Sequence, residues 1–154
     1  MKYIDLYNKL KFSPFFPGII KVYFDLKINL KSNSDIVGFI DEICLSHGFL
    51  PLNEEWKELS SNEAEDFFIS SLRFDIGFQY HERMPEERAK KFYQELLDGF
   101  NLEDCKTFTN WYNNPWINNY ESLGINTISD ATIDLALVTV AVDKLLFYFI
   151  SFED

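Results

Sequence analysis

The chain has 154 residues, of which 47% are hydrophobic and 18% aromatic, and its formal net charge is −11 at pH 7. This length and composition predict a single domain over residues 1–154 with a sizeable core, and they exclude an intrinsically disordered chain. The negative charge disfavours nucleic acid as a partner, because a phosphate-binding surface needs the opposite sign. It favours a basic protein partner, although acidity also serves solubility alone.

The amino-terminal part predicts alternating helices and strands. Residues 3–12 carry apolar side chains at helical spacing, and residues 20–30 alternate apolar and polar side chains as a strand with one buried face does. Residues 32–48 predict a helix that begins with Asn and Ser capping residues and ends at Gly48. Residues 52–59 are compatible with a loop or an edge strand, and we favour a short strand.

The middle of the chain contains two further helix signals. Residues 60–68 begin with serines followed by acids, which is typical of a helix start. We expect that helix to be short, because residues 72–82 return to a period of two and predict a strand. Residues 85–99 predict a helix that starts with proline and two glutamates and stops at glycine. Residues 105–112 predict another strand.

The carboxy-terminal part predicts a hairpin. Residues 132–142 and 145–152 are apolar on both faces, so we expect two central strands lying under helices. The overall expectation is an α+β fold, with a single antiparallel or mixed β-sheet and about four helices packed on it. The charges of Asp134, Asp143 and Lys144 break the apolar run below membrane-spanning length, and residues 1–12 lack the apolar core of a secretion signal. We therefore expect a cytoplasmic protein.

Signals for catalysis and metal binding are sparse. Cys44 and Cys105 form no CxxC pattern and lie at no metal-type spacing from His47 or His81. Cys44 and His47 share one predicted helix, but Cys44 lies on its apolar stripe, where a thiol is inert. We expect no enzyme activity, no catalytic residues, no metal and no cofactor.

Asp134 is the most unusual acid, because it lies in an apolar strand and must be paired or hydrogen-bonded there. One interpretation is structural, with Asp134 capping a nearby turn at the strand end. The other is functional, and it leaves open a carbohydrate-binding module or small hydrolase that uses Asp134 and the Trp/Asn loop of residues 110–122.

Two surface features predict partner binding instead. Residues 53–66 hold six acids and one lysine, and residues 110–122 combine Trp and Tyr with five Asn, as protein-binding loops do. These aromatic side chains either fill the core or are exposed for binding a partner. The predicted partner-binding residues are Glu54, Glu55, Glu58, Glu63, Glu65, Asp66, Trp111, Tyr112, Trp116 and Tyr120.

The last stretch, SDATIDLALVTVAVDKLLFYFISFED, resembles the carboxy-terminal hairpin of small bacterial immunity proteins of interbacterial toxin systems, including contact-dependent inhibition. The shared pattern is Thr-x-Asp at residues 132–134, an apolar strand, a turn, and an aromatic strand that ends in acids. The resemblance implies an antitoxin that occludes the active site of a cognate, basic, nuclease-type toxin domain. We expect a monomer or weak dimer that binds neither nucleic acid nor membrane.

Overall fold

A single antiparallel sheet organises the molecule. The computed structural model describes residues 20–24, 33–74, 81–116, 126–131, 133–142 and 144–152, with the backbone alone at 20–24, 33, 34 and 152. Within these ranges five strands follow the order β1-β5-β4-β3-β2, and every pairing is antiparallel. The strands are β1 (Ile20–Phe24), β2 (Lys57–Leu59), β3 (Lys106–Thr109), β4 (Ile133–Val140) and β5 (Lys144–Phe152). The expected α+β class is confirmed, with the antiparallel form of the sheet.

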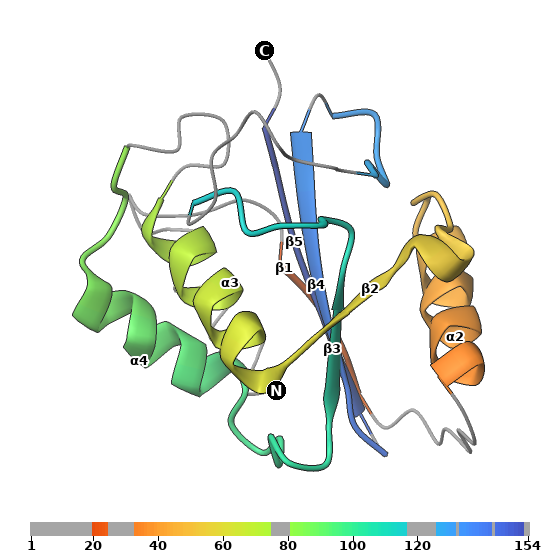
Figure 1. Cartoon of the computed structure of the whole chain (residues 1–154), viewed down its shortest axis with the longest axis horizontal. Coiled ribbons are helices and arrows are strands. Elements are labelled where there is room, and N and C mark those ends of the chain that lie inside the picture. The colour runs from red at the N-terminus through yellow and green to blue at the C-terminus, as the bar shows by residue number, and fades with distance from the viewer. Residues whose placement is uncertain are drawn as a thin grey trace.

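Helices cover both faces of this sheet. Helices α3 (Ser61–Arg73) and α4 (Glu86–Leu96) lie on one face, and α2 (Asn33–Ser46) lies on the other (Figure 1). A short 3₁₀ helix, η1 (Asn53–Glu55), connects α2 to β2. The described ranges thus contain three α-helices rather than about four. The additional helix expected at residues 3–12 lies outside these ranges.

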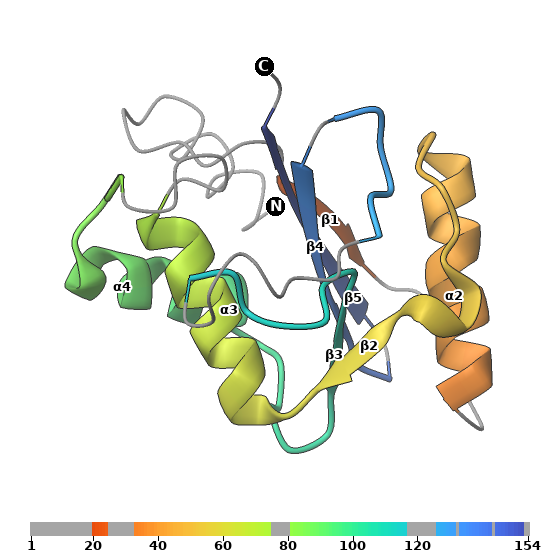
Figure 2. The ribbon, with the colours of Figure 1, turned by 45° about the horizontal axis from the view of Figure 1, so that its top comes forward.

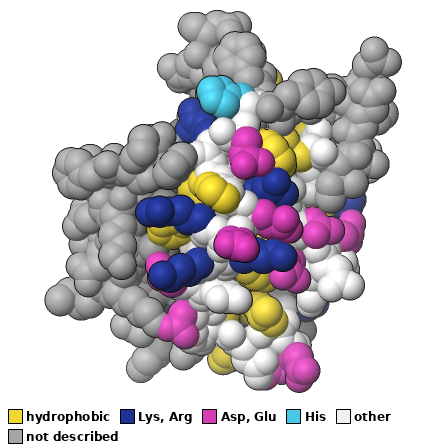
Figure 3. Space-filling view, turned by 90° about the vertical axis from the view of Figure 1, so that its left-hand side faces the viewer, with side chains coloured by type: hydrophobic (Ala, Val, Ile, Leu, Met, Phe, Trp, Pro, Cys, Tyr) yellow, Lys and Arg dark blue, Asp and Glu magenta, His cyan; other side chains and the backbone are white. Residues whose placement is uncertain are grey.

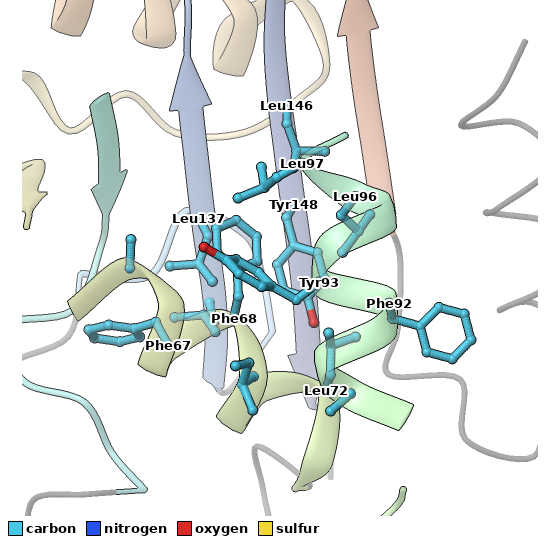
Figure 4. Close-up of a cluster of buried hydrophobic side chains, with 14 of the residues drawn as sticks. Phe67, Phe68, Leu72, Phe92, Tyr93, Leu96, Leu97, Leu137, Leu146 and Tyr148 are labelled. Atoms are coloured by element: carbon cyan, nitrogen blue, oxygen red, sulfur yellow. The ribbon is translucent and has the colours of Figure 1, made fainter. Parts of the chain in front are cut away.

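The sheet is central because its hairpin strands are apolar on both sides. Leu135 and Leu137 of β4 join the core cluster under α3 and α4, whereas Ala136 and Val138 join the cluster under α2. The same alternation holds along β5, where Tyr148 faces α3 and α4. Figure 4 shows Phe68, Tyr93 and Tyr148 meeting between the two helices and the sheet, with ring centroids of Phe68 and Tyr148 5.4 Å apart. The hairpin prediction is confirmed.

Helix α3 is longer than the sequence indicated. A capping box fixes its start, since the Ser60 hydroxyl accepts from the Glu63 N–H while the Glu63 carboxylate accepts from the Ser60 N–H. The helix then runs to Arg73, and Leu72 is fully buried on its core face. The strand expected from residue 72 is therefore wrong at its beginning. An isolated bridge joins Phe74 to Glu82, and residues 75–80 lie outside the description.

The remaining predictions hold in part. The strand expected at 105–112 is the four-residue β3, and the segment 52–59 divides into η1 and β2. The helices expected at 32–48 and 85–99 are α2 and α4, and positive φ angles at the glycines after them (81° at Gly48 and 88° at Gly99) fit the expected stops. Of the strand expected at 20–30, residues 20–24 form β1. No helix in the described ranges is long and apolar enough to cross a membrane.

Candidate functional site

The six acids of residues 53–66 lie on consecutive elements along one edge of the sheet. Glu54 and Glu55 belong to η1 and Glu58 to β2, while Glu63, Glu65 and Asp66 lie in the first two turns of α3. All six side chains are exposed. Figure 2 shows β2 running from the α2 side of the molecule to the start of α3. We call the six exposed acids of these consecutive elements the acidic edge.

Among the described residues, two lysines form ion pairs with these acids. Lys57 Nζ lies 3.9 Å from Glu63 Oε2, and Lys106 Nζ lies 3.8 Å from Glu58 Oε1. Both contacts are long and solvent-exposed, so each contributes little to stability. Hydrogen bonding to the Ser60 backbone lowers the pKa of Glu63, so this carboxylate is ionised and serves the helix start. Within the described ranges, six acids and two lysines leave the acidic edge with a net negative charge.

The face formed by α3 and α4 carries a different charge pattern. In Figure 3, Lys and Arg side chains alternate with Asp and Glu over the described part of this face. Helix α4 alone exposes Arg88, Lys90 and Lys91 together with Glu86 and Glu87. Charges of both signs at this spacing cancel within a short distance. The acidic edge, with six acids and two lysines, carries the larger excess of one sign.

Tyr112 connects the Asn-rich loop to the acidic edge. Its side chain is 50% exposed, and its hydroxyl donates to Glu55 Oε2 at 3.0 Å. The same residue's carbonyl oxygen accepts from Lys57 Nζ. The hydrogen bond to Glu55 raises the pKa of Tyr112. Tyr112 is thus an exposed aromatic side chain held at both ends beside the acids, and its place in a partner-binding surface stays a prediction.

The two tryptophans of the same loop lie deeper. Trp111 is 2% exposed, and its indole N–H donates to the Asp134 carbonyl oxygen at 2.7 Å. Trp116 is half-buried against the core cluster under α3 and α4. Of the two uses proposed for these aromatics, Trp111 fills the core. Tyr120 lies outside the described residues.

Two asparagines of this loop, Asn110 and Asn114, are buried and hydrogen-bonded to neighbouring backbone groups. Asn110 is 1% exposed, and its side-chain amide donates to Asp134 Oδ1 at 2.7 Å while its side-chain oxygen accepts from the Ala136 N–H at 2.8 Å. Asn114 is also buried, and its side-chain oxygen accepts from the Trp116 N–H at 2.9 Å. These amides satisfy backbone groups where β3 ends and the chain turns.

Asp134 is the centre of a buried polar junction. It is fully buried on β4, and its Oδ2 accepts from the backbone N–H groups of Ile128 at 3.0 Å and Ser129 at 2.9 Å and from the Ser129 hydroxyl at 2.6 Å. Oδ1 accepts from Asn110. Burial raises the pKa of Asp134, and the hydrogen bonds from these three residues oppose that rise. The interpretation of Asp134 as a residue that caps a turn agrees with this geometry.

A second buried carboxylate was missed by the sequence reading. Asp41 of α2 is 6% exposed and accepts from the backbone N–H groups of Leu52 and Asn53, both at 2.9 Å, and from the Trp56 indole at 2.8 Å. It holds the start of η1 against α2, where Asn53 has a φ of 53°. The sequence signal that could have indicated Asp41 is an acid next to the apolar stripe of a predicted helix. A buried acid needs hydrogen-bond partners, but residue spacing does not identify them.

The cysteines and histidines considered for catalysis differ in burial. Cys44 is fully buried, and burial, with the charge of Asp41, raises the pKa of its thiol to about 12. His47 and His81 are both exposed. In the ranges described, no three His, Cys, Asp or Glu side chains gather as they would around a metal ion. Comparison of the chain with protein-family models, curated proteins and solved structures found no match.

Proposed function

We propose that this chain is a non-enzymatic immunity protein that binds a cognate, basic, nuclease-type toxin domain and occludes its active site. The observation that carries the proposal is the acidic edge, where six exposed acids from residues 53–66 lie together with one lysine among them. The resemblance of the carboxy-terminal hairpin to immunity proteins supports the same function.

The acidic edge suits a partner that itself binds phosphates. A nuclease cleft is basic, so carboxylates can take the places that phosphates take in its substrate. The field of clustered acids also raises the rate of encounter with a basic surface, and salt screens this effect. Tyr112 adds a rigid aromatic contact next to Glu55, the kind of residue that carries much of an interface's binding energy.

The first experiment identifies the partner. The protein is immobilised, and lysate of its source cells is passed over it at low and moderate salt, with bound proteins identified by mass spectrometry. We expect one stoichiometric basic protein whose nuclease activity is blocked when the chain is added. Recovery of no such protein at either salt, or of one whose activity is unaffected, would contradict the proposal.

The second experiment locates the surface. With the captured partner, the double variant Glu54→Lys/Glu55→Lys should slow association at least tenfold at low salt, and Tyr112→Ala should speed dissociation. Glu42→Lys/Glu87→Lys is the matched control, because it makes the same charge change at exposed residues of α2 and α4. Equal effects of the two double variants would show that net charge, rather than the acidic edge, sets the rate.

A further inference from the structure

The carboxylate of Asp134 faces hydrogen-bond donors on both oxygens. The Asn110 amide donates to Oδ1, the Ser129 N–H and hydroxyl donate to Oδ2, and the Ile128 N–H lies within reach of both at 3.3 and 3.0 Å. An ionised carboxylate, which only accepts, satisfies all of them. A proton added to either oxygen must instead point at a group that can accept it.

Only one of these donors can also act as an acceptor. The backbone N–H groups and the amide nitrogen of Asn110 cannot accept, whereas the Ser129 hydroxyl can rotate to accept a hydrogen bond. That hydroxyl oxygen already accepts from the Ala131 N–H at 3.2 Å, and it lies 2.6 Å from Asp134 Oδ2, the short distance typical of a charge-assisted pair. Protonation of Asp134 would therefore turn the Ser129 hydroxyl hydrogen away and change the hydrogen bonding of the turn at residues 128–131.

We propose that Asp134 and Ser129 form a proton-sensitive latch. The ionised carboxylate holds the turn at residues 128–131 and the side chain of Asn110. Protonation reverses the Ser129 hydroxyl and weakens the hydrogen bonds from the Ile128 and Ser129 N–H groups. Because Asn110 precedes Trp111 and Tyr112, release of the latch loosens the base of the loop that presents Tyr112.

The surroundings of Asp134 make this carboxyl responsive to acid. Asn110 and Trp111 at the end of β3 are uncharged. Ser151, which pairs with Asp134 across β4 and β5, is also uncharged. On the α2 side, Asp41 is bound to its own donors and His47 is exposed, while Asp130 in the latch turn is also exposed. Burial raises the pKa of Asp134 above its ordinary value of 3.8, so it accepts a proton before an ordinary aspartate does.

The link between protonation of Asp134 and folding stability distinguishes release of the latch from unfolding in acid. A carboxyl whose pKa is raised on folding binds its proton more tightly in the folded chain. Its contribution to stability is complete at low pH and is lost as pH rises through the folded pKa. A carboxyl that stays buried but loses the hydrogen bonds from Ser129, Ile128 and Asn110 keeps the pKa rise caused by burial and loses the lowering that they provide, so it binds the proton more tightly than in the latched form. Acid therefore releases the turn locally, while the same proton favours the folded over the unfolded chain.

Nuclear magnetic resonance of the isolated protein between pH 7 and pH 3 tests the latch without any partner, so its outcome is independent of the proposed function. We expect the amide resonances of Ile128 and Ser129 and the Trp111 indole resonance to shift together, with a midpoint above 3.8. Exchange protection of the two amides, relative to the intrinsic rate at each pH, should fall roughly tenfold. Resonances that stay constant, or that change only when the whole chain unfolds, would overturn the proposal.

Variants assign the transition to the two residues. Ser129→Ala removes a donor to the ionised form, so the midpoint should move to higher pH, whereas Ser46→Ala, which removes a hydroxyl bound to a backbone carbonyl on α2, should leave it unchanged. Asp134→Asn should abolish the transition. If Asp134→Asn does not fold, Ser129→Ala still decides the matter, because an unchanged midpoint in that variant would refute the latch.

Discussion

Asp134 and Asp41 are both buried carboxylates that hold a neighbouring turn by its backbone N–H groups, but they lie in different settings. Asp134 is fully buried within the sheet, and its bonds from Asn110 and Ile128 are buried while those from Ser129 are partly buried. Asp41 lies on a helix at 6% exposure, and both of its backbone bonds are only partly buried. Water can replace a lost acceptor for both backbone donors to Asp41, but at Asp134 it can do so only for Ser129 and not for Asn110 and Ile128. The two carboxylates should therefore contribute different amounts to the free energy of unfolding.

The largest effect should come from Asp134→Ala. The change leaves the Asn110 amide and the Ile128 and Ser129 N–H groups without their acceptor inside the protein. We expect the free energy of unfolding to fall by about 3 kcal/mol or more, as for the loss of a buried hydrogen-bond network. Chemical denaturation measures it, with Asp130→Ala as control, because Asp130 is an exposed acid in the same turn. A loss below about 1 kcal/mol would show that the junction is energetically unimportant.

Asp41→Ala should come second, with a loss of about 2 kcal/mol, because three donors lose a partner but two of them can bind water. Glu42→Ala, at the exposed neighbouring position, should change stability by less than about 0.5 kcal/mol. The comparison between the junctions fails if Asp41→Ala costs as much as Asp134→Ala in the same denaturation series.

Each junction also contains a tryptophan N–H, and removing these donors should have smaller effects. Trp56 donates to the Asp41 carboxylate and Trp111 to the Asp134 carbonyl. Because a hydrogen bond to a charged group is the stronger kind, Trp56→Phe should cost about 1.5 kcal/mol and Trp111→Phe about 1 kcal/mol. The reverse order in thermal or chemical unfolding would mean that burial outweighs charge at these two sites.

The smallest effect concerns reactivity rather than stability. Burial and the charge of Asp41 raise the pKa of the Cys44 thiol to about 12, so little thiolate forms at pH 8. We expect iodoacetamide to label the half-buried Cys105 before Cys44 in the folded protein, as peptide mass spectrometry would show. Asp41→Asn, which removes the charge, should speed labelling of Cys44 and leave Cys105 unchanged. Equal rates at both cysteines in the unmodified protein would contradict this expectation.

The sequence predicted those elements whose signals are local. Helices α2 and α4 carry apolar stripes within their spans and are each followed closely by a stop glycine, and the hairpin strands are mostly apolar. The predicted end of α3 was wrong because Leu72 fits both a helical and a strand pattern. It continues the helical spacing of Phe68 and also starts the alternation that suggested a strand. The capping box at Ser60 and the helical core face outweighed that alternation.

The polar junctions depended on information that spacing does not contain. The sequence indicated that Asp134 needs partners, but Asn110 lies 24 positions away and meets it only because β3 pairs with β4. The burial of Trp111 has the same origin, since its indole bonds to the Asp134 carbonyl. Exposure of the acidic segment was easier to anticipate, because uncompensated carboxylates are rarely buried.

The order of strands in the sheet has a consequence for synthesis of the chain. Neighbours β2 to β5 follow one another along the sequence, so each can pair as soon as the next is made. Strand β1 instead pairs with β5, Ile20 opposite Tyr148, and must wait while more than a hundred residues leave the ribosome. Until then its backbone is an open edge, which a chaperone or a second nascent chain can bind.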